Sequence, residues 1–242
     1  MKLLAFAQRN AKEMIRDKLN LIFGIGFPVV LLLLLSAIQA NIPVQMFELN
    51  HLTPGIAVFG FSFMALFSGT LIARDRSSSF LMRLFSSPMN SADYIFGYTV
   101  PLIPMAIAQS AVCFIFALIL GLDFTPRIFL TVIVLIPAAV LFIAVGLLCG
   151  SVFTDKQVGG VCGALLTNVS AWLSGTWFEL DLIGGAFKRI AYMLPFANAV
   201  DAARAALNGN YGDIFKPLII VCAYAAVISV IAVIVFRKKM IM

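Results

Sequence analysis

Six long apolar runs contain no Lys, Arg, Asp, Glu or His, and they occupy most of this 242-residue chain. Each run has about 20 residues or more, the length that a helix rising about 1.5 Å per residue needs to cross a hydrocarbon core of about 30 Å. Backbone amides in lipid must be satisfied within the segment, so the runs have to be helices. We therefore predict an all-α polytopic membrane protein with six transmembrane helices. The runs are residues 19–38, 54–73, 94–122, 128–154, 158–178 and 217–236.

The uncharged interiors of these runs also constrain the energy source. Proton- and ion-coupled carriers usually keep an ionisable residue at membrane depth, and none of the six runs contains one. The chain has no Gly-Lys pair, so it has no GxxxxGK[ST] phosphate-binding loop. Its single histidine, His51, and its four cysteines show no metal-ligand spacing, so we predict neither a metal site nor a catalytic residue. If the chain moves a cargo, we expect another polypeptide to supply the energy.

Basic residues are concentrated on one side of the predicted membrane protein. With the N-terminus inside, 12 of the 17 Lys and Arg residues fall on the side that carries both termini. The positive-inside rule then places both termini in the cytoplasm, and we expect a bacterial plasma (inner) membrane. Topology accounts for the net charge of +6, so nucleic-acid binding is not needed to explain it.

The segment before the first run, residues 1–18, is amphipathic. Its apolar residues recur at helical spacing, and basic residues occupy the opposite side. Such a helix lies in the plane of the lipid headgroups. It either anchors the first span to membrane lipid or contacts a cytoplasmic partner, and periodicity alone leaves both readings open. The apolar residues are Leu3, Leu4, Ala7, Ala11, Met14 and Ile15, and the basic ones include Arg9, Lys12 and Arg16.

The cytoplasmic loop 74–93 carries a short apolar stripe at helical spacing. Ser77–Ser79 can cap the start of a helix there, and Pro88 ends it. A helix this short is not stable alone in water, so its aromatic side chains have to be buried. The headgroup layer, the protein's own helix ends or a socket on a partner could each bury them. The stripe consists of Phe80, Leu81, Leu84 and Phe85, with Arg76 and Arg83 beside it.

Residues 179–213 are too polar for a plain span and too apolar for a solvated loop. Gly184–Gly185 permits a sharp turn, and apolar residues lie on both sides of Pro195. We predict an outer re-entrant hairpin of two short helices, a backbone path that is tolerated when it packs on protein or lines a cavity. The i, i+3 spacing of Asp201 and Arg204 indicates a local ion pair.

Aromatic and neutral polar side chains within the runs are the candidate contacts for a cargo. They favour a hydrophobic or amphipathic cargo, although the aromatic residues could equally face lipid. The two amides could equally form hydrogen bonds between neighbouring helices. The candidates are Phe63, Phe67, Gln109, Asn168 and Trp172.

Three patches in order resemble the type-2 permease family of ATP-binding cassette (ABC) exporters, in particular its antibiotic and multidrug export branch. Residues 9–35 are similar to the family's arginine–aspartate entry and apolar-proline first span. Residues 74–97 resemble its loop with Ser/Thr-Pro followed by Tyr-Ile-x-Gly, and residues 173–204 resemble its outer Leu-Pro and Ala-Val-Asp-Ala-x-Arg signature. The chain departs from the family pattern at three places. Ser78–Ser79 replaces a Gly-Thr pair, Ala73 or Asp75 replaces a frequent Glu, and Tyr98 replaces a frequent Lys.

This resemblance implies that residues 1–242 form a single transmembrane domain with no enzymatic activity and no cofactor of its own. It implies a second permease subunit, as a homodimer or a heterodimer with a related permease. Two ABC ATPase subunits would dock beneath and would bind the ATP and magnesium. By the same implication, Arg76–Pro88 is the coupling helix, and residues 1–18 are the interface helix beside it.

Two other classes of function stay open from the sequence. One is a secondary carrier or channel that needs no ion or proton gradient, and the other is a membrane scaffold that transports nothing. Dependence of transport on ATP in vesicles would separate an exporter from a carrier. A neighbouring reading frame for a cassette ATPase would argue against a scaffold.

Overall fold

The protein is helical throughout the part of the chain that the structure describes. The computed structural model describes residues 2–42, 47–78 and 91–240, and the regular secondary structure in these ranges is all helix. Within these ranges, five helices are long and apolar enough to cross a membrane. The predicted all-α polytopic fold is therefore confirmed, and five of the six apolar runs coincide with these helices. Their bounds are Lys18–Gln39, Leu49–Ser77, Asp93–Ile119, Arg127–Val152 and Tyr211–Lys239.

Three of these five spans contain more than one helical element. The first joins α2 (Lys18–Leu21), the π-helical segment η1 (Ile22–Gly26) and α3 (Phe27–Gln39). The third joins α6 (Ser91–Thr99) and α7 (Leu102–Ile119). The break between α6 and α7 falls at Pro101, which has no amide hydrogen to donate within a helix. The other spans are α4 (Leu49–Ser77), α8 (Arg127–Val152) and α14 (Phe215–Met240), which follows the short 3₁₀ turn η3 (Tyr211–Asp213).

The remaining apolar run, 158–178, is helical but shorter than predicted. The elements α9 (Asp155–Val158), π-helical η2 (Gly159–Leu166) and α10 (Thr167–Leu173) follow one another without a break. A capping box starts them, in which Thr154 Oγ1 accepts from the Gln157 amide at 3.4 Å and Gln157 Oε1 accepts from the Thr154 amide at 3.0 Å. The helix stops at Leu173, and Gly175 then adopts a positive φ of 69°. Its first turn is polar and it ends early. This stretch is therefore not among the five helices that are long and apolar enough to cross a membrane.

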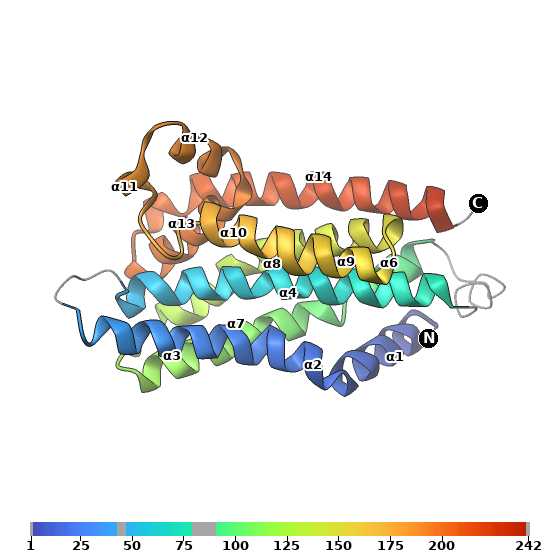
Figure 1. The fold of residues 1–242 in the computed structure, drawn as a ribbon, viewed down its shortest axis with the longest axis horizontal. Coiled ribbons are helices and arrows are strands. Elements are labelled where there is room, and N and C mark those ends of the chain that lie inside the picture. The colour runs from blue at the N-terminus through green and yellow to red at the C-terminus, as the bar shows by residue number, and fades with distance from the viewer. Residues whose placement is uncertain (1, 43–46, 79–90, 241–242) are drawn as a thin grey trace.

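Three short helices gather at one end of the bundle, opposite the end where both termini lie (Figure 1). They are α11 (Leu180–Ile183), α12 (Gly185–Met193) and α13 (Pro195–Asn208). The turn predicted at Gly184–Gly185 is present, and both glycines have positive φ. α13 begins with a proline at its first position and ends at Gly209 in the left-handed conformation, two features that favour those boundaries. It packs against α4, α8 and α14.

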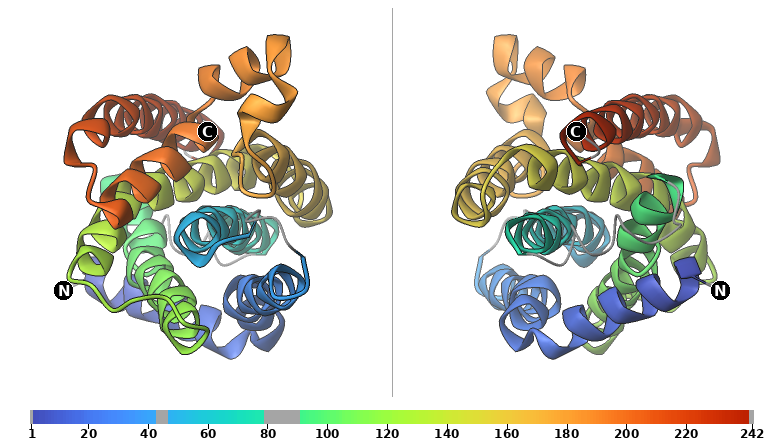
Figure 2. Two further views of the ribbon diagram at one scale, coloured as in Figure 1. Left: turned by 90° about the vertical axis from the view of Figure 1, so that its left-hand side faces the viewer. Right: turned by 90° about the vertical axis from the view of Figure 1, so that its right-hand side faces the viewer.

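The second span, α4, occupies the centre of the bundle. Viewed along the bundle, the other long helices surround it (Figure 2). In its apolar window, 94% of the residues are buried, against 17% in the window of the last span. α4 packs most extensively on α8 and also contacts α7, α3, η2 and α13. A movement of α4 therefore displaces side chains on most of the other helices.

Small residues allow α4 and α8 to approach closely. A Cβ atom at Gly146 of α8 would collide with the Ser68 hydroxyl and the Ala65 carbonyl of α4. A Cβ atom at Gly150, one turn later, would lie 2.5 Å from the Gly69 carbonyl oxygen. The Ser68 hydroxyl also lies 3.2 Å from the Ile143 carbonyl, which bridges the two helices. In lipid, close packing of this kind replaces the hydrophobic effect as the force that holds helices together.

The N-terminal helix α1 (Lys2–Arg16) lies at the end of the bundle that carries both termini (Figure 1). The helix is amphipathic, as predicted, and the face that packs on the protein is rotated from the apolar face that the sequence predicts for the headgroup layer. Leu4 and Ile15 are exposed, whereas Phe6 and Asn10 are buried together with Ala7 and Met14. The face is rotated because Phe6 packs over Gly97, where a Cβ atom would overlap its ring.

Gly146→Ala should lower the free energy of unfolding by about 1–3 kcal/mol, the usual cost of adding a methyl group to a filled contact. Denaturant unfolding in detergent micelles measures this change. Gly160→Ala is the matched control, because a Cβ atom at Gly160 meets nothing within 4 Å. Equal stability of the two variants would contradict the close contact between α4 and α8.

Candidate functional site

The whole apolar stripe of the predicted coupling loop, with Arg83 and Pro88, lies outside the described residues. The residues concerned are Phe80, Leu81, Arg83, Leu84, Phe85 and Pro88. The structure does describe the two helix ends that carry this loop, Ser77 at the end of α4 and Ser91 at the start of α6. Arg76 belongs to the last turn of α4. The candidate site that can be built from contacts is therefore the place where the loop joins the bundle.

Asp75, in the last turn of α4, is the centre of this site. Its side chain is nearly buried, with 4% exposed. Both carboxylate oxygens accept from the guanidinium of Arg9 on α1, with Arg9 Nη1–Asp75 Oδ2 at 2.6 Å and Arg9 Nη2–Asp75 Oδ1 at 2.9 Å. The Tyr98 hydroxyl of α6 donates to Oδ2 at 2.9 Å. A two-pronged arginine–carboxylate pair is among the strongest polar contacts, so Asp75 fixes α1 and α6 to the end of α4.

Further contacts hold α1 against α6. The Asn10 side-chain amide donates to the Gly97 carbonyl at 2.9 Å. The Phe6 ring meets the Tyr98 ring edge to face, with ring centroids 5.0 Å apart. Arg9 also pairs with Glu13 one turn along α1, at 2.6 Å. Partial burial disfavours the charged guanidinium of Arg9, but the hydrogen bond and charge of Asp75 outweigh it and raise the Arg9 pKa above its ordinary value.

The arginines on either side of Asp75 bind two other elements. Arg76 donates to the carbonyls of Ser151 and Phe153 at the C-terminal end of α8, the latter at 2.7 Å. These carbonyls have no partner within the helix, and the end of the helix carries partial negative charge, so a guanidinium is favoured there. Arg74 lies 3.4 Å from Asp17 and 3.3 Å from Asp155. Its side chain is more than half exposed, so these two ion pairs contribute little.

Three consecutive residues at the end of α4 thus reach four other parts of the bundle. We call Arg74, Asp75 and Arg76 with their partners the α4 junction. It joins α1, α6, α8 and the start of α9 directly before the loop 79–90. Chemically the junction can hold charge and resist separation, and its position suits it to carry force between the loop and the helices.

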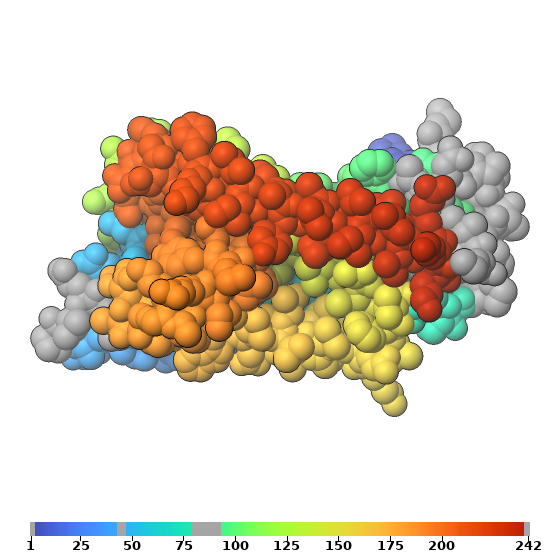
Figure 3. Space-filling view, turned by 90° about the horizontal axis from the view of Figure 1, so that it is seen from above, coloured from blue at the N-terminus to red at the C-terminus, as the bar shows by residue number. Residues whose placement is uncertain are grey.

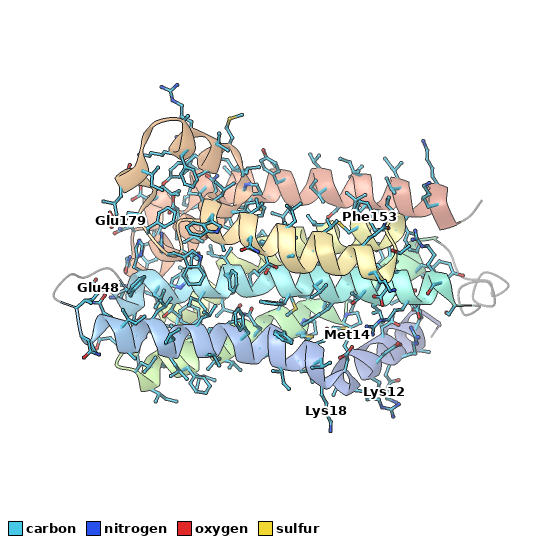
Figure 4. The ribbon with its side chains drawn as sticks, in the orientation of Figure 1. Lys12, Met14, Lys18, Glu48, Phe153 and Glu179 are labelled. Atoms are coloured by element: carbon cyan, nitrogen blue, oxygen red, sulfur yellow. The ribbon has the colours of Figure 1, made fainter. Side chains whose placement is uncertain are left out.

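Sequence reasoning missed the central role of Asp75 and Tyr98. Both had been noted as departures from the family pattern, without a contact assigned to either. Of the predicted interface-helix residues, the structure brings Arg9 to Asp75 and leaves Lys12 and Arg16 exposed. Lys12 projects away from the bundle (Figure 4). The sequence does contain one signal for the face of α1 that packs on the protein. Phe6 and Asn10 are one helical turn apart, and Phe6 is next to the predicted apolar residue Ala7.

The candidate cargo contacts divide between two locations. Phe63 belongs to an aromatic cluster with Phe59, Phe23 and Phe27, whose ring centroids lie 5.9, 6.5 and 5.8 Å from its own. Phe23 and Phe27 are partly exposed on the first span. Phe67 is buried one turn further along α4, against Gly24 of η1. Phe63 therefore stands beside an exposed aromatic surface, and Phe67 is a packing residue.

The two amides predicted as cargo contacts lie in different environments. Gln109 is fully buried on α7 and fits against Gly60 of α4, and its Oε1 has no hydrogen-bond partner among the described residues. Asn168 is exposed, and its amide donates to the Ala164 carbonyl of its own helix at 2.8 Å. Trp172, one turn beyond Asn168, is 56% exposed. Asn168 and Trp172 share one exposed face of η2 and α10, and Gln109 lies inside the bundle.

At the opposite end of the bundle, Arg204 of α13 holds two backbone segments. Its Nε donates to the His51 carbonyl and its Nη2 to the Gly175 carbonyl, both at 2.9 Å. The predicted ion pair with Asp201 is present at 3.9 Å, the longest contact of the three. Burial lowers the pKa of Arg204 to about 10. This value is still well above neutral pH, so the guanidinium stays charged. Arg204 thus ties α13 to the start of α4 and to the turn after α10.

Asp75→Asn should lower the free energy of unfolding by about 1–3 kcal/mol. Breaking a fully buried ion pair costs about 3–5 kcal/mol, and Arg9 is about one-third exposed, which reduces the loss. Unfolding in micelles of the single variants Asp75→Asn and Arg9→Gln and of the double variant tests the pairing. The double variant should be more stable than the sum of the single losses predicts, and strict additivity would contradict a direct pair. Arg16→Gln, on the exposed face of α1, is the control and should change stability by less than about 0.5 kcal/mol.

Comparison with known proteins identifies the family of the chain. No curated protein matches the sequence. A family model described as ABC-2 type transporter matches residues 1–208, which include α1, the α4 junction and α13. The match covers well over half of the chain and extends to the end of α13, and the resemblance seen in three sequence patches is thereby confirmed. The chain belongs to the ABC-2 type transporter family and is a multi-pass membrane protein.

Proposed function

We propose that this chain is the permease subunit of an ATP-driven ABC exporter and forms half of the translocation pathway. The cargo is hydrophobic or amphipathic, such as a drug, an antibiotic, a peptide or a lipid-like molecule. ATP and magnesium bind to a separate ABC ATPase, two copies of which dock beneath two permease subunits. The second permease is another copy of this chain or a related one. The α4 junction is the observation that carries this proposal, because it connects the loop 79–90 to several helices at once.

The junction suggests how hydrolysis is coupled to movement. The coupling helix predicted from Arg76 can begin only after Ser78, because Arg76 and Ser77 belong to α4. An ATPase that displaces this segment pulls on Arg76 and Asp75, whose side chains are bonded to α8, α1 and α6. The pull continues along α4, which is buried along its length. Phe63 lies 14 residues before Ser77, a distance of about 21 Å along a helix that rises about 1.5 Å per residue. The α4 junction at the end of α4 and the aromatic cluster near its middle are therefore joined by one continuous helix.

The arrangement of the ends supports a six-span topology. Both termini lie at the same end of the bundle (Figure 1), which requires an even number of crossings. The continuous helix α9–η2–α10 returns the chain toward the end that carries α11–α13 and supplies the sixth crossing. The excess of basic residues at this end favours a cytoplasmic location for both termini. We infer that the membrane is a bacterial plasma (inner) membrane. The segment 179–213 then forms the outer re-entrant hairpin, held by Arg204.

The exposed face of η2 and α10 is the favoured place for the second permease and the cargo. Asn168 carries a polar amide on this face, and an amide in contact with lipid tails alone is costly. Trp172 adds a large aromatic surface beside it. A pathway between two copies would bring this face and the aromatic cluster around Phe63 into one cavity. Gln109 then acts inside the subunit by holding α7 against α4.

Phe80→Ala and Phe85→Ala should each release the ATPase or uncouple hydrolysis from transport while leaving membrane insertion unchanged. Truncation of a buried Phe costs about 3–5 kcal/mol, and we expect about half of that at a docking socket. Co-purification with the ATPase and ATP-dependent transport in vesicles measure the effect. Arg83→Gln is the control, because an exposed ion pair contributes about 0–1 kcal/mol. Full ATPase association and transport in both Phe variants would refute the coupling assignment.

Asn168→Ala and Gln109→Ala should have different effects because their environments differ. Asn168→Ala should change cargo-stimulated ATPase activity and leave basal activity and assembly intact. Gln109→Ala should instead lower the stability of the subunit by about 0.5–3 kcal/mol, because it removes a buried side chain that fills the contact with Gly60, without a specific effect on stimulation. ATPase assays on the reconstituted complex with and without cargo, and unfolding of the permease alone, separate the two. Leu165→Ala, at another exposed position on η2, is the control. The same effect from Asn168→Ala and Leu165→Ala would argue against a polar cargo contact.

A further inference from the structure

An apolar groove of about 350 Å³ opens on the surface between α6–α7, α8 and α14. Its floor is formed by Ile143, Ala144 and Leu147 of α8, each of which is less than 5% exposed. One wall comes from α6 and the start of α7, including Phe96 and Val100. The other comes from Ser229 and Val233 of α14. Figure 3 shows α14 as a ridge along this face of the molecule. The groove has the volume of a small-molecule site and an almost wholly apolar lining.

The groove lies away from the proposed cargo pathway. The helices α14 and α6 lie on one side of the bundle and η2 with α10 on another (Figure 2). Apart from Ile143 of the core beneath it, the groove shares no residue with the contacts assigned above to coupling, cargo or packing. Its lining belongs to the spans Asp93–Ile119, Arg127–Val152 and Tyr211–Lys239, so it is at the depth of the lipid tails.

One face of α14 leads from this groove to a cluster of positive charge. Ser229, Val233 and Arg237 follow at i, i+4 and i+8, which places them on the same side of the helix. Arg237 is therefore about 6 Å beyond the last groove residue of α14, at a rise of about 1.5 Å per residue. Lys238 and Lys239 follow directly, and all three basic side chains are exposed. The groove thus passes from an apolar interior to a basic surface at the end that carries both termini.

We propose that this groove binds an anionic phospholipid of the surrounding leaflet, with one acyl chain in the groove and its phosphate at Arg237. An acyl chain is a single file of methylene groups and fits between two adjacent helices. A helix of a second subunit is about 10 Å wide and associates through small residues. The groove walls instead carry bulky side chains such as Phe96 and Val233, which favours the narrower occupant.

The charge cluster selects the headgroup. Basic residues at a membrane surface attract anionic lipids by about 1 kcal/mol each, which is about five-fold in affinity. The bound lipid would fill the space between α14 and α6–α7, above the floor formed by α8. In this way the last span, of which little is buried, gains a second packed surface in the membrane.

Photo-crosslinking of the full-length wild-type chain in vesicles tests the site directly. The probe is phosphatidylglycerol with a diazirine in mid-chain, diluted into phosphatidylcholine. The label should concentrate on peptides that contain residues 95–103, 140–147 and 229–233, and unlabelled phosphatidylglycerol should compete for it. Labelling spread evenly over other exposed faces, such as that of α3, would overturn the proposal.

Substitutions separate the acyl chain from the headgroup, with lipid retention measured by native mass spectrometry of the full chain in detergent. Arg237→Gln should reduce the preference for phosphatidylglycerol over phosphatidylcholine about five-fold. The matched control is Lys216→Gln, an exposed basic residue at the other end of α14, which should leave the preference unchanged. An equal loss in both variants would show a general charge effect and overturn the site.

Ser229→Phe fills the groove and should reduce the retention of both lipids. Val230→Phe, the same bulk at the neighbouring exposed position, should not. Retention unaffected by Ser229→Phe would overturn the acyl-chain assignment. Conversion of a dimer to a monomer by Ser229→Phe would show that the groove binds a second subunit and would also refute the proposal. The crosslinking pattern of the wild type decides the question if Ser229→Phe fails to fold.

Discussion

The burial of α4 along nearly its whole length is the constraint on which this structure depends. A helix surrounded by other helices in a membrane gains little from the hydrophobic effect, because lipid tails are as apolar as its neighbours. It is held by close contact instead, and the glycines of α8 permit that contact with Ala65, Ser68 and Gly69. The surrounding helices do not need comparable burial, and α14 remains largely exposed. The bundle is organised around one rod.

The ends of this rod are fixed by charge, in contrast to its middle. At one end Asp75 and Arg76 bind α1, α6 and the carbonyls of α8. At the other end Arg204 donates to the backbone carbonyls of His51 and Gly175. Buried polar contacts in a low-dielectric setting resist separation and fix relative positions. A member of the ABC-2 type transporter family needs such stiffness if an event at one surface is to alter the other. The coupling we propose uses the same contacts that stabilise the fold.

Sequence alone predicted the spans well, because length and the absence of charge suffice to identify a helix in lipid. It placed the fifth run, residues 158–178, too far toward the C-terminus, since hydropathy does not show where Gly175 turns the backbone. The pairing of Arg9 with Asp75 joins residues 66 positions apart, and no local pattern encodes it. For the same reason periodicity did not show that Phe6 and Asn10 form the face of α1 that packs on α6. Gln109 and Asn168 looked alike as neutral amides, and only packing distinguishes the buried one from the exposed one.

The π-helical segment η1 lies in the first span, which carries the exposed rings of Phe23 and Phe27, and η2 lies in the continuous helix α9–η2–α10. Both contain glycines, and both precede the portions that carry Phe27 on one span and Asn168 on the other. A π turn holds one residue more than an α turn, so exchanging its hydrogen bonds for α-helical ones shifts the following helix by about one residue, or about 100° of rotation and 1.5 Å of rise. The two π-helical segments therefore set the direction in which Phe27 and Asn168 project from their helices, about 100° away from where an uninterrupted α-helix would place them.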